Sequence, residues 1–131
     1  MQKKVSIVLG VVFVLVGVLG MISTPIVGHE ATSYFMTNII HDVVHLVIGL
    51  VLLYVALKKD SVLAVTLKTV GVVYLLVAAL GFVAVETVSN TGSILGLVAV
   101  NTADNWLHVV LGVVILGLGL CKCSKDESVT V

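Results

Sequence analysis

The segment "NTADNWLHVVLGVVILGLGL" (Asn101–Leu120) begins with hydrogen-bonding side chains and continues as an unbroken apolar run. A chain this apolar cannot face water along its length. In lipid, a helix is the structure that satisfies the hydrogen bonds of such a segment within itself. We therefore predict a membrane-spanning helix with polar groups at one end.

The composition of the whole chain supports a lipid environment. Hydrophobic residues make up 60 % of the 131 residues and charged residues 11 %, whereas soluble domains average about 45–50 % and about 25 %. A soluble domain of this length could not bury so much apolar surface. The formal net charge of zero gives no indication of a nucleic-acid partner. We expect residues 1–131 to form a single integral membrane domain whose main partner is the lipid bilayer.

Four apolar runs are long enough to cross a membrane. The first contains 18 residues, which as a helix would extend about 27 Å. It lacks a small-residue cleavage site, so we expect it to be retained as a span rather than removed as a signal peptide. The four predicted spans are Val5–Ile22, Ile39–Leu57, Thr69–Val85 and Ala103–Leu120. The third is expected to have a more polar start near Leu63.

The lysines indicate the orientation of the spans. In a four-span arrangement all positive charges fall on one side, and the two segments on the other side contain none. The positive-inside rule assigns the lysine side to the cytoplasm. We therefore predict a bacterial inner-membrane protein with both termini in the cytoplasm, including a short tail over residues 121–131. The lysines are Lys3, Lys4, Lys58, Lys59, Lys68, Lys122 and Lys125.

Two pairs of similar segments indicate an internal repeat. The segment "GVVFVLVGVLGMI" (Gly10–Ile22) resembles "GVVYLLVAALGFV" (Gly71–Val83), and "NIIHDVVHLVIG" (Asn38–Gly49) resembles "NTADNWLHVVLG" (Asn101–Gly112). Apolar composition cannot by itself produce the matched Asn, His and Gly. We predict two helical-hairpin repeats, about 5–57 and about 66–120, that enter the membrane in the same sense. Parallel repeats of this kind are related by a pseudo-two-fold axis along the membrane normal, and here they would form a four-helix bundle.

Small residues are expected to allow close packing of these helices. Lipid provides no hydrophobic drive between helices, so close backbone approach at small residues contributes much of their association. Gly49 and Gly112 follow the matched histidines by one turn and leave room for an imidazole or a neighbouring helix. The predicted packing glycines are Gly10, Gly17, Gly49, Gly71 and Gly112.

Polar side chains at spacings of three and four form a stripe on the second span and another on the fourth. His45 and His108 each lie seven residues beyond an asparagine, so both are about 10 Å deeper than it. Polar groups at this depth should turn inward and pair. We predict one cluster near the outer face, containing His41, Asp42, His45, Asp104, Asn105 and His108, with Asn38 and Asn101 nearer the surface, where they can cap their helices.

These motifs resemble a known family. The segments "NTADNWLHVVLG" and "NIIHDVVHLVIG" look like the two copies of the N-x-x-[HD]-[ND]-x-x-H-x-x-x-G signature in a bacterial four-span membrane family, domain-of-unknown-function family 4383. The second-span copy departs from the pattern, with Asp42 in place of asparagine. The resemblance implies the four-span architecture over most of the chain and implies no activity.

The cluster is open to several interpretations, of which the main one is structural. In that interpretation its hydrogen bonds clasp the two hairpins together, and the bundle can also dock a membrane-protein partner or a second copy of itself. A second interpretation is a divalent transition metal such as Zn²⁺, bound by His41, His45, Asp104 and His108. A third is ligation of haem b by His45 and His108. The last is a small transporter or proton relay. We expect no enzymatic activity, because no nucleophile–base arrangement is present.

Two smaller features complete the expectations. The outer segment Ser93–Val100 is too apolar for a free loop, so it either lies on the membrane interface or covers the polar cluster as a lid. The Tyr74 hydroxyl, inside the third span, is expected to bond to a local backbone carbonyl.

Overall fold

The computed structural model describes residues 1–121 and shows a mostly all-α membrane protein. Each of its four main helices is long and apolar enough to cross a membrane. They are α1 (Gln2–Ile22), α2 (Ile39–Lys58), α3 (Leu63–Ala84) and α4 (Thr102–Leu120). Of the predicted tail 121–131, residues 122–131 lie outside the described part of the chain.

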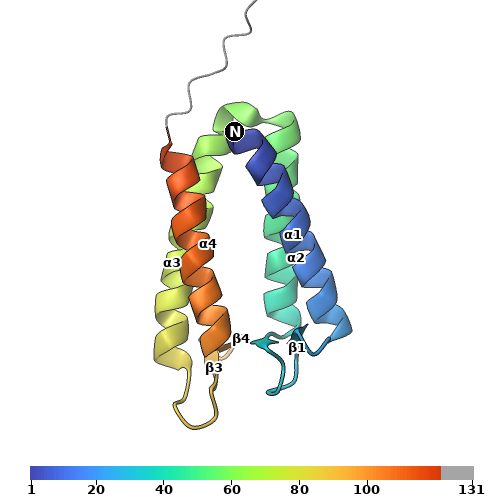
Figure 1. Cartoon of the computed structure of the whole chain (residues 1–131), viewed down its shortest axis with the longest axis vertical. Coiled ribbons are helices and arrows are strands. Elements are labelled where there is room, and N and C mark those ends of the chain that lie inside the picture. Colours follow the sequence, from blue (N-terminus) through green and yellow to red (C-terminus); the bar gives the residue numbers. More distant parts are fainter. Residues whose placement is uncertain (122–131) are drawn as a thin grey trace, which may run out of the picture.

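The helices form two hairpins that stand side by side, α1 with α2 and α3 with α4 (Figure 1). Both hairpins run in the same direction, and a short 3₁₀ helix, η1 (Asp60–Val62), connects them at the end that also holds the amino terminus. The Gln2 side chain donates to the backbone oxygens of Leu118 at 2.6 Å and Cys121 at 3.1 Å, so the two described ends of the chain meet. Their relation as sequence repeats stays a prediction.

Glycine brings the helices of each hairpin into close contact. A Cβ atom on Gly71 would lie 2.5 Å from the backbone nitrogen of Leu116 on α4, and one on Gly17 would lie 2.8 Å from the backbone oxygen of Asp42 on α2. The glycines that follow the histidines by one turn also lie against a neighbouring helix. Gly49 approaches the backbone of Gly10, and Gly112 approaches Leu75.

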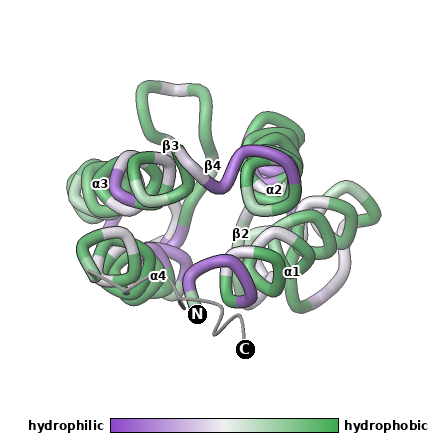
Figure 2. The backbone as a smooth tube through the Cα atoms, turned by 90° about the horizontal axis from the view of Figure 1, so that it is seen from above, coloured by the Kyte–Doolittle hydropathy of each residue, from purple (hydrophilic) through white to green (hydrophobic). Residues whose placement is uncertain are grey.

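The apolar surface is turned outward as well as inward. Seen along the bundle, the helices are hydrophobic on every side (Figure 2). Large aliphatic side chains such as Val47 and Leu76 are more than half exposed. The buried core lies between the hairpins and includes Phe13, Leu67 and Ile115. An exterior this apolar is the surface expected of a protein dissolved in lipid.

Short strands occupy the end of the bundle opposite η1, and the sequence did not indicate them. The first pair, β1 (Val27–Gly28) and β2 (Phe35–Met36), is parallel, with Val27 opposite Phe35. The second pair, β3 (Thr91–Ile94) and β4 (Val98–Asn101), is an antiparallel hairpin with Ile94 opposite Val98. The outer segment that we expected as an interfacial stretch or a lid is this hairpin. Its tip is exposed, while β4 covers the histidines described below.

Candidate metal centre

The first turns of α2 and α4 are fixed in the same way. The Asn38 side chain accepts a hydrogen bond from the backbone N–H of His41, and the Asn101 side chain accepts one from the N–H of Asp104, both at 3.0 Å. Asparagine is a favoured N-cap because its oxygen satisfies an otherwise unpaired helical N–H. The caps predicted from the sequence are therefore confirmed. Each cap asparagine precedes the matched histidine of its helix, His45 or His108, by the same number of residues.

Each cap asparagine also bonds to the other hairpin. Its partner lies in the segment that connects the two helices of that hairpin. The Asn38 amide donates to the Leu97 backbone oxygen at 2.8 Å, and the Asn101 amide donates to the Tyr34 backbone oxygen at 3.0 Å. These reciprocal bonds hold the two hairpins together above the histidines.

Three buried histidines from two hairpins meet below the caps. His41 and His45 project from α2 and His108 from α4, and one ring nitrogen of each lies within 4.8 Å of those of the other two. Each residue is at most 5 % exposed. The Nε2 atoms of His41 and His45 are 3.0 Å apart. The sequence spacing had placed these three side chains in one cluster, and the structure brings them together.

Asp104 contributes a buried carboxylate beside the histidines. Its Oδ2 atom lies 3.8 Å from His41 Nε2 and 3.9 Å from His108 Nδ1. Among the described residues, neither Asp104 Oδ2 nor His108 Nδ1 has a hydrogen-bond partner. Buried polar atoms are nearly always satisfied, so two unpaired atoms facing one another need a further partner.

Hydrogen bonds fix the orientation of His41. Its Nδ1 atom lies 2.7 Å from the backbone oxygen of Ala99 on β4, and because a carbonyl only accepts, Nδ1 carries the proton. The Nε2 atom of a neutral His41 ring therefore presents a lone pair toward His45. Metal-ligating histidines commonly donate their second ring nitrogen to a carbonyl in this manner. Sequence reasoning did not identify Ala99, because a backbone oxygen leaves no mark in a sequence.

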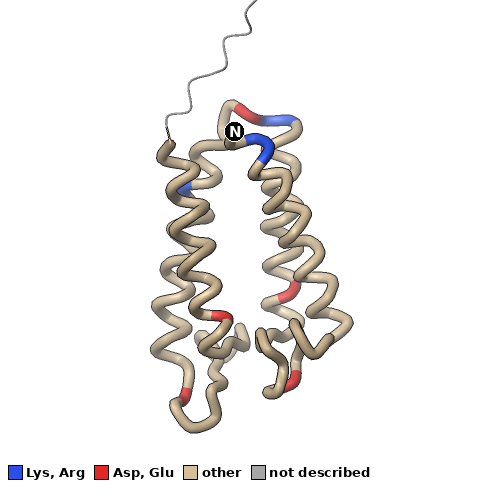
Figure 3. Tube along the Cα trace, viewed as in Figure 1, with Lys and Arg blue, Asp and Glu red and all other residues tan. Residues whose placement is uncertain are grey.

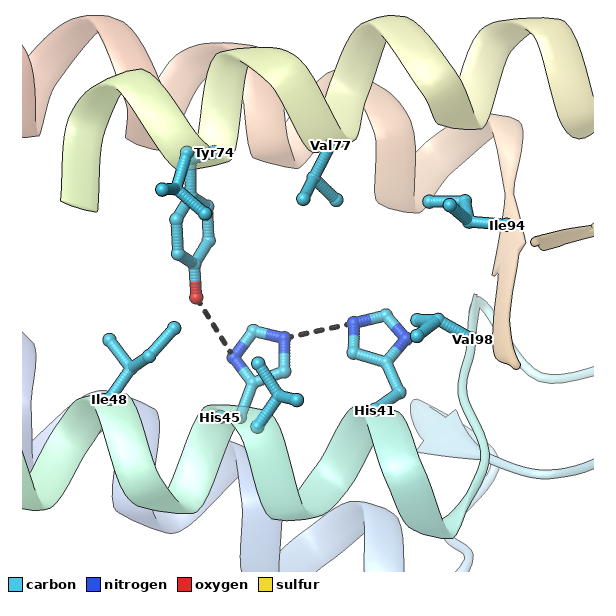
Figure 4. Close-up of a pocket in the computed structure, with 9 residues that line it drawn as sticks. His41, His45, Ile48, Tyr74, Val77, Ile94 and Val98 are labelled. Carbon is cyan, nitrogen blue, oxygen red and sulfur yellow. Dashed lines mark hydrogen bonds between the residues drawn. The ribbon is translucent and has the colours of Figure 1, made fainter. Parts of the chain in front are cut away.

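The Tyr74 hydroxyl belongs to the same centre, and the expectation of a local carbonyl partner was wrong. Tyr74 projects from α3 and its hydroxyl lies 3.4 Å from His45 Nδ1 (Figure 4). The Tyr74 ring also packs edge-on against His108, with 5.2 Å between ring centroids. The Tyr74 ring is directed across the space between the hairpins, so its hydroxyl finds its partner on the facing helix α2.

Asp42 and Asn105 do not join the cluster, which corrects the six-residue prediction. Asp42 packs against Gly20 of α1 and its Oδ2 atom accepts a hydrogen bond from His29 Nε2 at 2.7 Å. Asn105 packs in the same manner against Gly81 of α3. Both lie one position along the helix from a cluster residue, and the turn of about 100° per residue directs them into their own hairpin.

The remaining atoms form a set of side chains that could hold a metal ion. Zn²⁺ binds imidazole nitrogen and carboxylate oxygen at about 2.0–2.1 Å, which puts tetrahedral ligand atoms about 3.4 Å apart. The separations of 3.0, 3.8 and 3.9 Å lie on both sides of that value, and the three histidine nitrogens lie within 4.8 Å of one another, so they would have to draw closer around an ion. Three neutral imidazoles and one carboxylate suit a divalent first-row transition metal.

Comparison with known proteins bears on the family of the chain. The family model described as "Domain of unknown function (DUF4383)" matches residues 3–121. No curated protein and no solved structure matches the chain. The match covers all four helices and agrees with the resemblance seen in the two histidine motifs, so the chain belongs to the DUF4383 family.

Proposed function

We propose that this protein binds one divalent transition metal ion between its two hairpins, with His41, His45, His108 and Asp104 as the ligands. The observation that carries the proposal is the convergence of three buried imidazoles whose nitrogens lie within 4.8 Å of one another. The unpaired Asp104 oxygen and His108 nitrogen support it, because an ion would supply the missing partner for both.

The ion would act as the clasp that joins the hairpins. The α2 ligands belong to the first hairpin and the α4 ligands to the second, so every bound ion links the two. Binding requires His45 Nε2 to release its proton, since that atom donates to the His41 Nε2 lone pair when no ion is present. The His45 ring then carries its proton on Nδ1 and donates to the Tyr74 oxygen.

A clasp made of hydrogen bonds alone is the second candidate. The chain of bonds from Tyr74 through His45 and His41 to the Ala99 oxygen is complete without an ion. It leaves Asp104 and His108 unpaired, which favours the metal. Haem is disfavoured because the cavity beside His45 has a volume of about 180 Å³, enough for a single ring and not for a porphyrin. The apolar inner part of each helix offers no continuous polar path for a relay.

The proposal predicts the metal content of the purified protein. After incubation with Zn²⁺ or Co²⁺ and removal of free ions, the chain should retain about one ion, as a four-ligand site does. The His45→Ala/His108→Ala variant should retain less than about a tenth of that amount, because two ligands cannot hold the ion. Elemental analysis measures the content, and bound Co²⁺ should show the absorption bands of a tetrahedral complex.

The matched control is His29→Gln, which removes the histidine outside the cluster and keeps a donor for Asp42. It should bind metal as the unmodified chain does. Tyr74→Phe should bind about 10–100-fold more weakly, because it removes a partner of a ligand. An unmodified chain that holds no more ion than the double variant would contradict the metal and leave the hydrogen-bonded clasp.

We also propose that the metal centre lies in the outer half of the inner membrane and that both termini are cytoplasmic. The described lysines all lie toward the end of the bundle that contains η1 and the amino terminus, and the metal centre lies toward the other end (Figure 3). Positive charge is retained on the cytoplasmic side. A reporter that folds only in the cytoplasm, fused after the last residue, should therefore be active. Activity of an export-dependent reporter at the same point would reverse the orientation.

A further inference from the structure

A cavity of about 180 Å³ lies between α2 and α3, beside the candidate metal centre. The aliphatic side chains that line it include Ile48 of α2, Val77 of α3, and Ile94 and Val98 of the β3–β4 hairpin (Figure 4). Because α2 and α3 belong to different hairpins, the cavity interrupts the contact between the two halves of the bundle. The metal proposal makes no use of this space.

The polar atoms beside the cavity are directed at one another and not into it. The Nδ1 atom of His41 bonds to a backbone oxygen at 2.7 Å, and its Nε2 atom lies 3.0 Å from His45 Nε2. The remaining His45 nitrogen lies 3.4 Å from the Tyr74 hydroxyl. The wall therefore exposes almost no polar atom to the interior. A water molecule in a cavity needs several polar partners, so this cavity excludes water.

The cavity opens toward the hydrocarbon layer of the membrane. Its mouth lies at Val44 on α2 and Val73 on α3, which line it and are also 44 % and 42 % exposed. The 20 residues of α2 extend about 30 Å, which matches the thickness of the hydrocarbon core. Val44 lies six residues beyond the cap Asn38, so it is about 9 Å inside that layer. The mouth is therefore adjacent to lipid chains and not to headgroups or water.

We propose that this cavity holds part of the hydrocarbon chain of a bilayer lipid, which fills the gap between the two hairpins. An apolar cavity of about 150 Å³ is sufficient for the carbons of benzene, so about 180 Å³ accommodates a chain segment of about six carbons. An unfilled cavity would leave its aliphatic walls without contacts on one side, and a lipid chain supplies the missing dispersion attraction. The inference is independent of the metal, because the chain occupies the space between α2 and α3 and not the space between the ligand nitrogens.

The test uses NMR on the full chain in nanodiscs of dimyristoylphosphatidylcholine, with the protein deuterated except at its isoleucine methyl groups. Nuclear Overhauser effects between these methyl groups and the protons of the lipid chains report direct contact. Ile94 and Ile115 form a matched pair, because they are 7 % and 0 % exposed and of the two only Ile94 lines the cavity. Ile94 should show cross-peaks to the lipid chains, and Ile115 should show none.

Val77→Phe should remove the cross-peaks between Ile94 and the lipid chains, because the added ring occupies the cavity. The control Val72→Phe adds the same ring to the same helix, at a position that is 45 % exposed and does not line the cavity, and it should keep them. Circular dichroism checks that both variants are folded. Cross-peaks from Ile94 to water, no cross-peak from Ile94 to lipid, or lipid cross-peaks that persist in Val77→Phe would overturn the proposal. Should Val77→Phe not fold, the comparison of Ile94 with Ile115 in the unmodified chain decides.

Discussion

Gly71→Ala is expected to lower the free energy of unfolding by about 3 kcal/mol, the upper part of the range for overpacked sites. The added Cβ would lie 2.5 Å from the backbone nitrogen of Leu116 and 2.7 Å from its Cα atom. A backbone cannot rotate aside as a side chain does, so α3 and α4 must move apart. Separation of these helices loses the van der Waals contacts that hold membrane helices together.

Gly117→Ala provides the matched control on the facing helix. It adds the same methyl group to α4, next to Leu116, and meets no atom within 4 Å. Because alanine favours the helix over glycine by up to about 1 kcal/mol, the control should lose no stability. Reversible unfolding in mixed micelles measures both variants. Equal unfolding free energies would show that the close approach of α3 and α4 does not contribute to stability.

Hydropathy alone predicted the four helices because an apolar run in lipid has few alternatives to a helix. The third helix begins at Leu63, where the sequence indicated a more polar start ahead of the apolar run from Thr69. The residues before Thr69 include Lys68, which lowers the hydropathy at the start of the helix without opposing a helix. The two-residue and four-residue strands left no comparable pattern, because their pairing depends on segments that only the fold brings together.

Helical spacing predicted the candidate metal centre in part. Residues three and four apart share a face, and this placed His41, His45 and His108 with Asp104. The same rule could not separate Asp42 from His41, because both are within three or four residues of Asn38 and His45. The positions of the glycines could have separated the two residues. Gly20 and Gly81 occur at matching places in the two hairpins, and each is the contact of the side chain that leaves the cluster.

His29→Ala is expected to lower the free energy of unfolding by about 3 kcal/mol, because it removes a hydrogen-bond partner of a buried carboxyl group. Asp42 is fully buried, its Oδ2 atom lies 2.7 Å from His29 Nε2, and its Oδ1 atom has no partner among the described residues. His29 lies in the segment between α1 and α2, and its side chain is 31 % exposed. Its bond to Asp42 therefore ties that segment to the membrane-spanning part of the chain.

The second hairpin has asparagine at the position that corresponds to Asp42, and this suggests Asp42→Asn as the second substitution of a double-mutant cycle. Asn105 lies against Gly81 as Asp42 lies against Gly20, so an amide fits this position. Asp42→Asn alone should change stability by less than about 1 kcal/mol, since the amide oxygen still accepts from His29. In the Asp42→Asn background, His29→Ala should cost about 1 kcal/mol, which gives a coupling of about 2 kcal/mol. Equal losses from His29→Ala in the two backgrounds would mean that the histidine stabilises the outer segment by some contact other than the Asp42 carboxylate.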